Sequence, residues 1–400
     1  MTHFLGGNQI QLLRNGAEYF PALEAAIANA VNEIYLQTYI YEADKIGVRI
    51  GNALKRAAQR GVMVNLLLDG FGCKNLPKTY VKELESAGVQ VMFYRPKISP
   101  WTLKKNRLRR LHRKVVVVDG EIGFVGGINI IDDYNVAAHM PPRIDYAVRV
   151  EGHLLPAMLA SVHKLWRRIA LVHLESIRSQ PIHSPPIILK ATIDANNIAN
   201  TSDTHAVKGL KAAFIMRDNI LHRHDIEKAY LTAIGHAHTE VIIANAYFVP
   251  GRKFRKALLE AAKRGVTVKL LLQGRMEYFL MFATHAFYSV FLSHGVEIYE
   301  YRKGFMHSKV AVIDSHWATI GSSNIDPFSL LLAREANVVV RDKTFATALR
   351  ADIMLSIQEG TYQVSPQEWA NGHLIKRLVS WVAYGLVRGF VGVIGFSKEQ

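Results

Sequence analysis

The sequence predicts a chain of two homologous α/β domains, because it contains the same segments twice. Residues 51–70 (GNALKRAAQRGVMVNLLLDG) match residues 255–274 (RKALLEAAKRGVTVKLLLQG) at an offset of 204. Residues 111–130 (LHRKVVVVDGEIGFVGGINI) match residues 306–325 (MHSKVAVIDSHWATIGSSNI) at an offset of 195. Strand-like and helix-like segments alternate in both copies, which is typical of mixed or parallel sheets with helices on both faces.

The elements expected in each copy follow the same order. An apolar strand comes first, at 33–41 in the first copy and at 240–249 in the second. The next segment has helical periodicity, stops at an Arg-Gly pair and continues into a short apolar strand, since glycine commonly ends a helix. A further helix then leads to a strand at 87–94 in the first copy and at 294–301 in the second.

The repeat and the local composition divide the chain into four parts. The segment between the copies contains three prolines and the polar run IDANNIANTSDTH, which is typical of a linker. The two offsets differ because the first copy carries a longer loop at about residues 95–110. We expect an N-terminal domain at 1–171, a linker at 172–210, a C-terminal domain at 211–360 and an apolar and basic C-terminal segment at 361–400.

The composition excludes several classes of protein. Half of the residues, 50%, are hydrophobic, which is too apolar for a disordered basic tail. Cys73 is the one cysteine, so no internal disulfide or thiolate cluster can form, and a reducing compartment is natural. The net charge of +16 indicates a polyanionic partner, and charge alone leaves nucleic acid and an anionic membrane equally open.

Each copy carries the pattern His-x-Lys-x-x-x-x-Asp on a strand-like run, followed by a turn of small residues. Side chains at i and i+2 of a strand share a face, so the histidine and lysine project together while the aspartate lies at the strand end. Small residues in the turn let the backbone approach a phosphate, and Asn or Ser supplies neutral donors. The residues are His112, Lys114, Asp119 and Asn129 in the first copy, and His307, Lys309, Asp314, Ser322 and Asn324 in the second.

This set of side chains suits chemistry at a phosphorus atom. Histidine changes protonation near neutral pH, with an ordinary pKa of about 6.5. Of two histidines on opposite sides of a phosphorus, one can attack in line while the other protonates the leaving oxygen. Lysines and asparagines can hold the non-bridging oxygens, so no metal or other cofactor is expected. One such motif would be weak evidence, whereas two at equivalent places in a repeat indicate a site.

On these motifs the chain resembles the phospholipase D superfamily, which is defined by paired H-x-K-x-x-x-x-D motifs. The segments VIIANAYFVPG, HSKVAVIDSHWATIGSSNIDPFSLLLAREAN and HRKVVVVDGEIGFVGGINI resemble bacterial cardiolipin synthases, over about residues 8–360. Without the long, doubly membrane-spanning N-terminus of the commonest type, the chain is most similar to the short type. The resemblance implies two phospholipase D-like α/β sandwich domains related by pseudo-twofold symmetry, with the active site at their interface.

The resemblance also implies a reaction. One phosphatidylglycerol would donate its phosphatidyl group to an enzyme histidine and release glycerol, and a second would accept the group, giving cardiolipin. His112 would be the nucleophile and His307 the general acid and then base, although the near symmetry of the halves leaves this order open. Asp119 and Asp314 would buttress the site rather than react.

Two further matches bear on the site. Asp145 and Glu335 occupy the acidic position that the family places after each motif, and they would orient an imidazole, with the choice of which one left open. The second copy has Ser322-Ser323 where the first has Gly126-Gly127, which suggests that the two halves treat the phosphate unequally.

Two basic segments suggest contact with a membrane surface. Residues 374–396 are apolar with three cations, and their longest uncharged run is too short to span a bilayer. Such a segment suits the headgroup region, and a helix packed on the protein's own body is the alternative. Residues 97–114 hold eight basic and no acidic residues, so they would contact anionic headgroups or form a solvated loop. We expect a peripheral protein on the cytoplasmic face of a bacterial cell membrane.

Several functions fit these features. A phosphatidyltransferase that makes cardiolipin is favoured, with phosphatidylglycerol, other anionic phospholipids and the membrane surface as partners. A phospholipase D-type hydrolase would use the same residues with water as acceptor. The charge permits a nuclease, but the C-terminal segment and the length of the chain argue against it, so no nucleic acid partner is expected. Intact motifs disfavour a non-catalytic lipid-binding protein. Phosphatidylethanolamine or glycerol could enter the same cycle, and the oligomeric state stays open.

Overall fold

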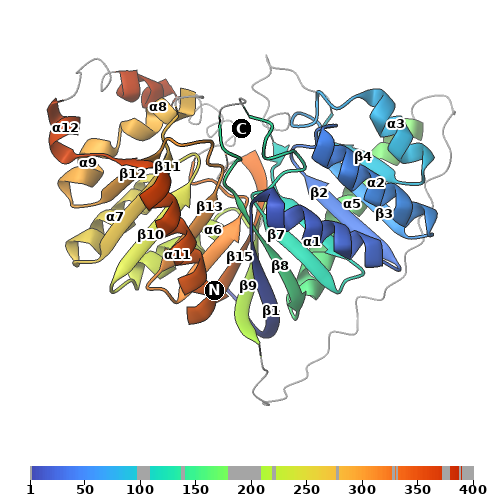
Figure 1. The fold of residues 1–400 in the computed structure, drawn as a ribbon, viewed down its shortest axis with the longest axis horizontal. Coiled ribbons are helices and arrows are strands. Elements are labelled where there is room, and N and C mark those ends of the chain that lie inside the picture. Colours follow the sequence, from blue (N-terminus) through green and yellow to red (C-terminus); the bar gives the residue numbers. More distant parts are fainter. Residues whose placement is uncertain are drawn as a thin grey trace, which may run out of the picture.

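The computed structural model describes most of both repeats. Much of the predicted linker, of the basic segment at 97–114 and of the segment at 374–396 lies outside the described residues. The mixed α/β architecture predicted from the repeat is confirmed (Figure 1). The described residues are 2–96, 109–136, 140–178, 209–218, 222–275, 279–326, 329, 332–371, 379–386 and 389.

The first half contains the predicted strands and helices in the predicted order, and a strand and a helix that the repeat did not indicate, β1 (Leu5–Arg14) and α1 (Asn15–Asn29), precede them. The strand expected at 33–41 ends at Thr38, and the backbone N–H of Ile40 is held by the Asn129 side chain instead of by a neighbouring strand. The elements are β1 (Leu5–Arg14), α1 (Asn15–Asn29), β2 (Glu33–Thr38), α2 (Lys45–Gln59), β3 (Met63–Asp69), α3 (Lys78–Ser86), β4 (Gln90–Tyr94), β5 (Arg110–Leu111), β6 (Lys114–Val118), β7 (Ile122–Gly126), β8 (Tyr146–Gly152) and α5 (Leu155–Arg178).

The second half repeats this order and adds a short strand and a short helix after its last long helix. The elements are β9 (Leu210–Arg217), α6 (Asp225–Gly235), β10 (Glu240–Asn245), α7 (Arg252–Lys263), β11 (Thr267–Gln273), α8 (Phe279–His285), α9 (Tyr288–Ser293), β12 (Glu297–Tyr301), β13 (Lys309–Ile313), β14 (Trp317–Gly321), β15 (Ala333–Arg341), α11 (Lys343–Gly360), β16 (Thr361–Gln363) and α12 (Pro366–Asn371).

One continuous mixed sheet runs through both halves. Its strand order is β16-β12-β11-β10-β13-β14-β15-β9-β1-β8-β7-β6-β2-β3-β4. From the central antiparallel pair of β9 and β1 outward, equivalent strands follow in the same order on both sides, as pseudo-twofold symmetry requires. The outer strands β2, β3 and β4 are parallel, as are β10, β11 and β12, so each half has one end of its sheet at which parallel strands terminate together.

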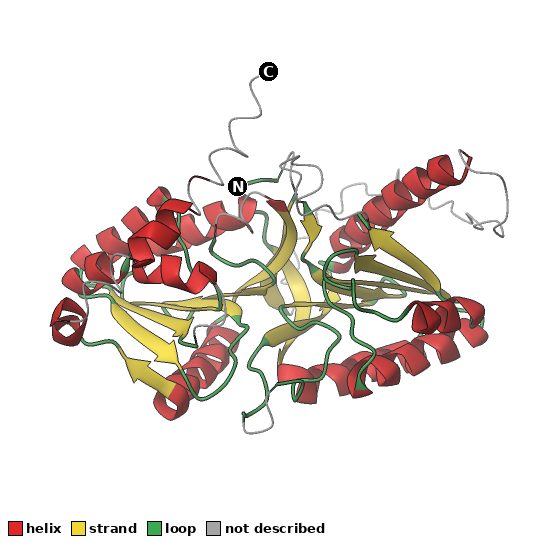
Figure 2. Cartoon of the chain, turned by 90° about the horizontal axis from the view of Figure 1, so that it is seen from above, coloured by secondary structure: helices red, strands yellow, loops and turns green. Residues whose placement is uncertain are grey.

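Apolar cores lie on both faces of the sheet, which the helices cover (Figure 2). Alternate residues of β6 point into different cores, as the strand period requires: Val116 and Val118 pack with α1, α2 and α3, whereas Val115 and Val117 face the other side. That second core is shared, because α5 of the first half and α11 of the second both contribute to it. The shared core and the β9–β1 pair join the halves into one body.

The aspartates of the two motifs close the ends of their strands. Asp119 and Asp314 have φ angles of 53° and 51°, in the left-handed region that aspartate tolerates better than most residues. Each carboxylate accepts hydrogen bonds from successive backbone N–H groups of the loop that leads into the neighbouring strand. The donors are Val31, Asn32 and Glu33 for Asp119, and His238, Thr239 and Glu240 for Asp314.

Asp119→Gly and Asp314→Gly should each lower the free energy of unfolding by about 1–3 kcal/mol, because backbone donors lose a charged acceptor. Glycine keeps the positive φ accessible, so the loss reports the hydrogen bonds and not backbone strain. The hydrogen bonds hold the pKa of Asp314 below its usual 3.8, although burial opposes them, so its contribution is present above that pH and is lost as pH falls. Urea denaturation measures the effect. Glu121→Ala, at an exposed position in the same turn, is the control, and an equal loss there would contradict this assignment.

Candidate active site

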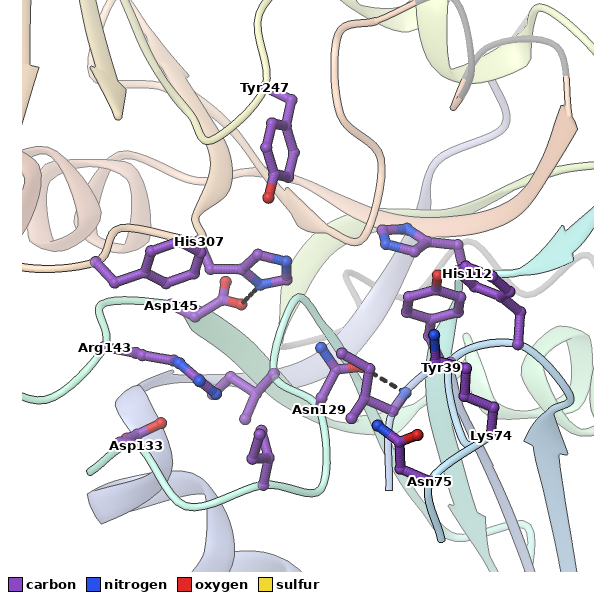
Figure 3. Close-up of a pocket in the computed structure, with 16 residues that line it drawn as sticks. Tyr39, Lys74, Asn75, His112, Asn129, Asp133, Arg143, Asp145, Tyr247 and His307 are labelled. Atoms are coloured by element: carbon purple, nitrogen blue, oxygen red, sulfur yellow. Dashed lines mark hydrogen bonds and ion pairs between the residues drawn. The ribbon is translucent and has the colours of Figure 1, made fainter. Parts of the chain in front are cut away.

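A cavity of about 590 Å³ lies between the two halves and receives residues from both. Its walls come from the loops that follow β2, β3 and β10 and from the segments that carry the two motifs. The ends of parallel strands are a usual place for a site, since loops from several strands converge there. The lining residues include Tyr39, Phe71, Lys74, Asn75, His112, Asn129, Asp133, Arg143, Asp145, Tyr247, Phe305 and His307 (Figure 3).

The structure brings the two predicted histidines together across this cavity, with the Tyr247 side chain reaching toward the space above them (Figure 3). Nδ1 of His112 lies 2.9 Å from Oε1 of Glu335, and Nδ1 of His307 lies 2.7 Å from Oδ2 of Asp145. Each histidine is therefore held by the acidic residue of the other half. The sequence left open which imidazole each carboxylate contacts, and the pairing is crosswise.

Backbone pairing between the halves explains why the contacts cross. The strand β5, which runs into His112, pairs with the start of β15 just before Glu335. An isolated bridge joins Ile144, just before Asp145, to Met306, just before His307. The backbone N–H of His112 donates to the carbonyl of Arg334 at 3.0 Å, and that of His307 to the carbonyl of Ile144 at 2.8 Å. The backbone just before each motif histidine therefore pairs with the backbone just before the acidic residue of the opposite half.

The backbone before each motif has a second support within its own half. Asp69, at the end of β3, accepts a hydrogen bond from the backbone N–H of Leu111 at 2.7 Å. The equivalent residue in the second half, Gln273, accepts one from the N–H of Met306 at 3.2 Å. These positions are the last letters of the repeated LLLD and LLLQ runs, so the repeat itself was the signal that could have identified them.

The serine and glycine that distinguish the two turns are in contact with the carboxylates and not with the cavity. The Ser322 hydroxyl donates to Oε2 of Glu335 at 2.5 Å and is fully buried. The offset of 195 aligns Gly126 with Gly321 and Gly127 with Ser322, so the pairing of Ser322-Ser323 with Gly126-Gly127 is corrected by one residue. At Gly127, an added Cβ would lie 2.2 Å from Oδ1 of Asp145, so the shorter Asp145 packs where a side chain would otherwise sit. The asymmetry seen in the sequence therefore compensates for the different lengths of aspartate and glutamate.

Both motif lysines are buried beneath the histidines. Lys114 donates from Nζ to the carbonyl oxygen of its own His112 at 2.7 Å, and Lys309 donates in the same way to His307. Burial lowers the pKa of Lys114 to about 7 and that of Lys309 to about 8, although the nearby carboxylates oppose the shift. A bound phosphate anion would favour the charged form of both lysines.

The histidines have lowered pKa values in the free protein. Burial is the main cause for both, and the positive charges of Lys309 and Lys114 add to it and bring the pKa of His307 well below 6.5. A carboxylate can only accept hydrogen bonds, so Nδ1 of each neutral imidazole carries the hydrogen. The lone pair on Nε2 is then free for reaction. Burial raises the pKa of Asp145 to about 6, which still leaves it charged at pH 7.

The two asparagines are placed differently. Asn129 lines the cavity and accepts the backbone N–H of Ile40 through Oδ1 at 3.0 Å, so its amide group remains as a donor. Asn324 is buried and its Nδ2 lies 3.5 Å from the Ser329 hydroxyl. Asp119 and Asp314 are not brought to the histidines, since each lies beyond the far end of its motif strand.

Several cavity residues lie outside the motifs, and the sequence did not identify them. They are Tyr39, Phe71, Lys74, Asn75, Arg143, Tyr247 and Phe305. Most sit on loops just after a strand ends, and position at a strand end was the signal available for them. Arg143 precedes Asp145 by two residues, so the strand period could have placed both side chains on one face.

Comparison with known proteins agrees with this geometry. The family model described as "Cardiolipin synthase, PLD-like domain" matches residues 23–138 and 230–354, one match in each half. The chain is 38% identical over 391 residues to cardiolipin synthase B of Salmonella typhimurium, with 98% of this chain and 90% of that protein covered. It is 36% identical over 401 residues to cardiolipin synthase B of Escherichia coli K12, with the same coverage.

Solved structures share the fold at low sequence identity. The phosphatidylserine synthase of Haemophilus influenzae superposes with a TM-score of 0.68 at 14% identity, with 99% of this chain and 96% of that chain covered. The polyphosphate kinase of Porphyromonas gingivalis gives a TM-score of 0.55 at 12% identity, covering 96% of this chain and 56% of that one. The chain belongs to the cardiolipin synthase family of phospholipase D-like proteins.

Proposed function

We propose that this protein is a cardiolipin synthase that transfers a phosphatidyl group between two phosphatidylglycerol molecules through a phosphohistidine. The observation that carries the proposal is the pair of crosswise-held imidazoles facing one cavity. The relatives named cardiolipin synthase B, at 36–38% identity over nearly the whole chain, support the substrate and product.

In the first step, Nε2 of His112 attacks the phosphorus of the donor lipid. An N–P bond forms while the bond from phosphorus to the oxygen of the glycerol headgroup breaks. The bound anion raises the pKa of His307, so that His307 carries a proton on Nε2 and gives it to the leaving oxygen, releasing glycerol. Lys114 and Lys309 stabilise the charge on the non-bridging oxygens.

In the second step the roles reverse. Nε2 of His307 removes the proton from a glycerol hydroxyl of the acceptor, whose oxygen attacks the phosphorus while the N–P bond breaks. His112 is restored, the proton is back on His307, and cardiolipin is the product. Glu335 and Asp145 keep each imidazole in the required tautomer throughout. The assignment of His112 as the nucleophile and of His307 as the acid follows the order that the resemblance to the family implies.

The pH dependence of kcat/KM, which reports the free enzyme, should show two limits. Both histidines have pKa values below 6.5, so the attacking imidazole stays neutral at that pH and the acidic decline begins lower. Above the histidine pKa values the free enzyme must take up the proton that His307 donates, so kcat/KM should fall as pH rises. The fall should steepen as the lysine charges are lost through about 7 and about 8. Because bound phosphate raises the lysine pKa values, kcat should decline at higher pH than kcat/KM. A kcat/KM that keeps rising to pH 9 would contradict this assignment.

The function is tested by incubating the purified protein with phosphatidylglycerol in detergent micelles and analysing the lipids by mass spectrometry. Cardiolipin and glycerol in equal amounts are expected. His112→Ala and His307→Ala should each abolish turnover, and His316→Ala, at an exposed position after β13, should retain it. Phosphatidic acid as the main product would replace the proposal with a hydrolase, and DNA cleavage without lipid turnover would reject both.

The C-terminal helix at 379–386 supports a membrane-surface location. One side packs on the body, with Ser380 and Ala383 fully buried and the Tyr384 ring 4.8 Å from that of Phe287. The other side is apolar and exposed: Val379, Trp381, Val382 and Leu386 are 42–60% exposed. The packing on the body fits one alternative drawn from the sequence, and the exposed apolar side supports the membrane-surface alternative. Within the described ranges, no helix has the length and apolarity needed to cross a bilayer.

The position of this helix relative to the cavity suits delivery of lipid. Phe287, on which it packs, follows α8, and α8 follows the carboxyl end of β11. The parallel pair β10–β11 and the antiparallel pair Asn245–Lys309 place that end of the sheet beside His307. The helix and α8 lie together at the upper edge of Figure 1. We propose that this edge rests on the membrane surface.

Trp381→Ser combined with Val382→Ser should weaken binding to phosphatidylglycerol vesicles at least tenfold, because a fully buried apolar side chain contributes about 1.5–3 kcal/mol. Sedimentation with vesicles measures binding. Val31→Ser is the matched control, since Val31 is an exposed valine, 74% accessible, at the opposite end of the sheet. Unchanged sedimentation of the double variant would contradict the membrane-surface role of this helix.

A further inference from the structure

We propose that Arg143 forms a separate anion subsite that binds the acceptor lipid's own phosphodiester and so selects a phosphorylated acceptor. This inference rests on the proposed function and adds to it a reason why one alcohol is preferred over others. It concerns a cation that belongs to neither motif and lies in the same cavity.

The backbone places Arg143 two residues before Asp145, the residue that holds His307. The backbone of Ile144 makes hydrogen bonds on both sides of Met306, donating to the Phe305 carbonyl at 3.0 Å and accepting from the His307 N–H at 2.8 Å. The segment is therefore extended, and Arg143 and Asp145 project on the same side, about 7 Å apart along the chain. On the facing segment, Phe305 and His307 are spaced in the same way.

The side chains form two adjacent pairs. Asp145 holds His307, and the guanidinium of Arg143 lies over the Phe305 ring at 5.7 Å. The Phe305 ring is itself stacked with the His307 imidazole, with centroids 6.2 Å apart and 16° between the planes. The positive charge of Arg143 is close enough to lower the pKa of His307, after burial, the two lysines and His112. The cation is thus fixed beside His307 without touching it.

The guanidinium is held at one end and has a donor in reserve. Its Nη2 donates to the carbonyl of Asn135 at 2.7 Å. Its Nε–H is buried and has no hydrogen-bond partner among the residues that the structure describes. The Oδ2 atom of the neighbouring carboxylate, Asp133, accepts the backbone N–H of Gly16 at 2.6 Å. A buried donor without an acceptor is costly. Because the Arg143 side chain lines the cavity, a turn of the guanidinium would bring this N–H to a phosphodiester oxygen, which would satisfy it with a charge-assisted bond.

The position of Arg143 fits the acceptor and not the donor. The donor phosphorus must lie between the two imidazoles, above Lys114 and Lys309, whereas Arg143 is displaced beyond His307 into the cavity (Figure 3). In the second step the acceptor hydroxyl sits at His307, and its own phosphate is one three-carbon bridge away. Water and simple alcohols lack that phosphate, so Arg143 would favour phosphatidylglycerol over both.

Two soluble acceptors test the subsite directly, because both present a glycerol hydroxyl and only one of them carries a phosphodiester. Phosphatidylglycerol in detergent micelles is the donor, and deuterated glycerol or glycerophosphoglycerol is the acceptor. Mass analysis then gives kcat/KM for each acceptor. The wild-type enzyme should prefer glycerophosphoglycerol, and Arg143→Ala should lower the ratio of the two kcat/KM values at least tenfold. The ratio cancels any effect of the substitution on His307, because both reactions use that histidine. Arg143→Lys keeps the charge and should retain part of the preference.

Arg149→Ala is the control, because Arg149 pairs with Glu151 on β8 and does not line the cavity; its preference should equal that of the wild type. The subsite would be overturned, and the proposed function left standing, by an unchanged acceptor preference in Arg143→Ala. The same holds if, in Arg143→Ala and in Arg143→Lys, transfer to glycerol and transfer to glycerophosphoglycerol fall by the same factor. A wild-type enzyme that transfers to neither acceptor and forms no cardiolipin would overturn the proposed function, and the subsite with it.

Discussion

The crosswise contacts of His112 with Glu335 and of His307 with Asp145 are the constraint on which the rest of the structure depends. A neutral imidazole presents a reactive Nε2 lone pair only while Nδ1 donates its hydrogen elsewhere. Because each acceptor carboxylate comes from the opposite half, neither half can complete a histidine alone. The central β9–β1 pair and the core shared by α5 and α11 are what keep these contacts at hydrogen-bond distance.

The internal repeat was sufficient to predict the α/β fold, the order of strands and helices from β2 and from β10 onward, and the residues at which the two motifs begin. It did not reveal β1, α1, β9 and α6, which precede those strands in the two halves. The contacts that make the site were not predictable in the same way, because they join residues 223 and 162 positions apart and depend on which strands pair between the halves. Ser322 illustrates the limit. Its difference from Gly127 was visible in the sequence, but only the structure shows that the hydroxyl serves a carboxylate. Tyr247 and Arg143 lie outside the motifs, so the motif pattern did not reveal them.

Burial prepares the site for an anion. Lysines with lowered pKa values and histidines that are neutral in the free protein both gain from a phosphodiester, whose charge favours their protonated forms. The net charge of +16 did not distinguish nucleic acid from membrane as a partner. Part of that charge belongs to cations at the cavity, where it favours an anion. Lys114 and Lys309 are buried next to the two histidines, and Arg143 lines the cavity near His307. The exposed apolar side of the C-terminal helix adds a surface that suits lipid and has no use in binding nucleic acid.

Nitrogen-15 NMR of the imidazoles in the full-length protein tests the crosswise pairing most directly. With labelled histidine, and with His112→Gln and His307→Gln used for assignment, both site imidazoles should be neutral at pH 7 with the hydrogen on Nδ1. Glu335→Gln should then shift the His112 signals and leave those of His307 nearly unchanged, and Asp145→Asn should do the reverse. Hydrogens on Nε2 of the free enzyme, or a carboxylate variant that shifts the histidine of its own half instead, would contradict the account.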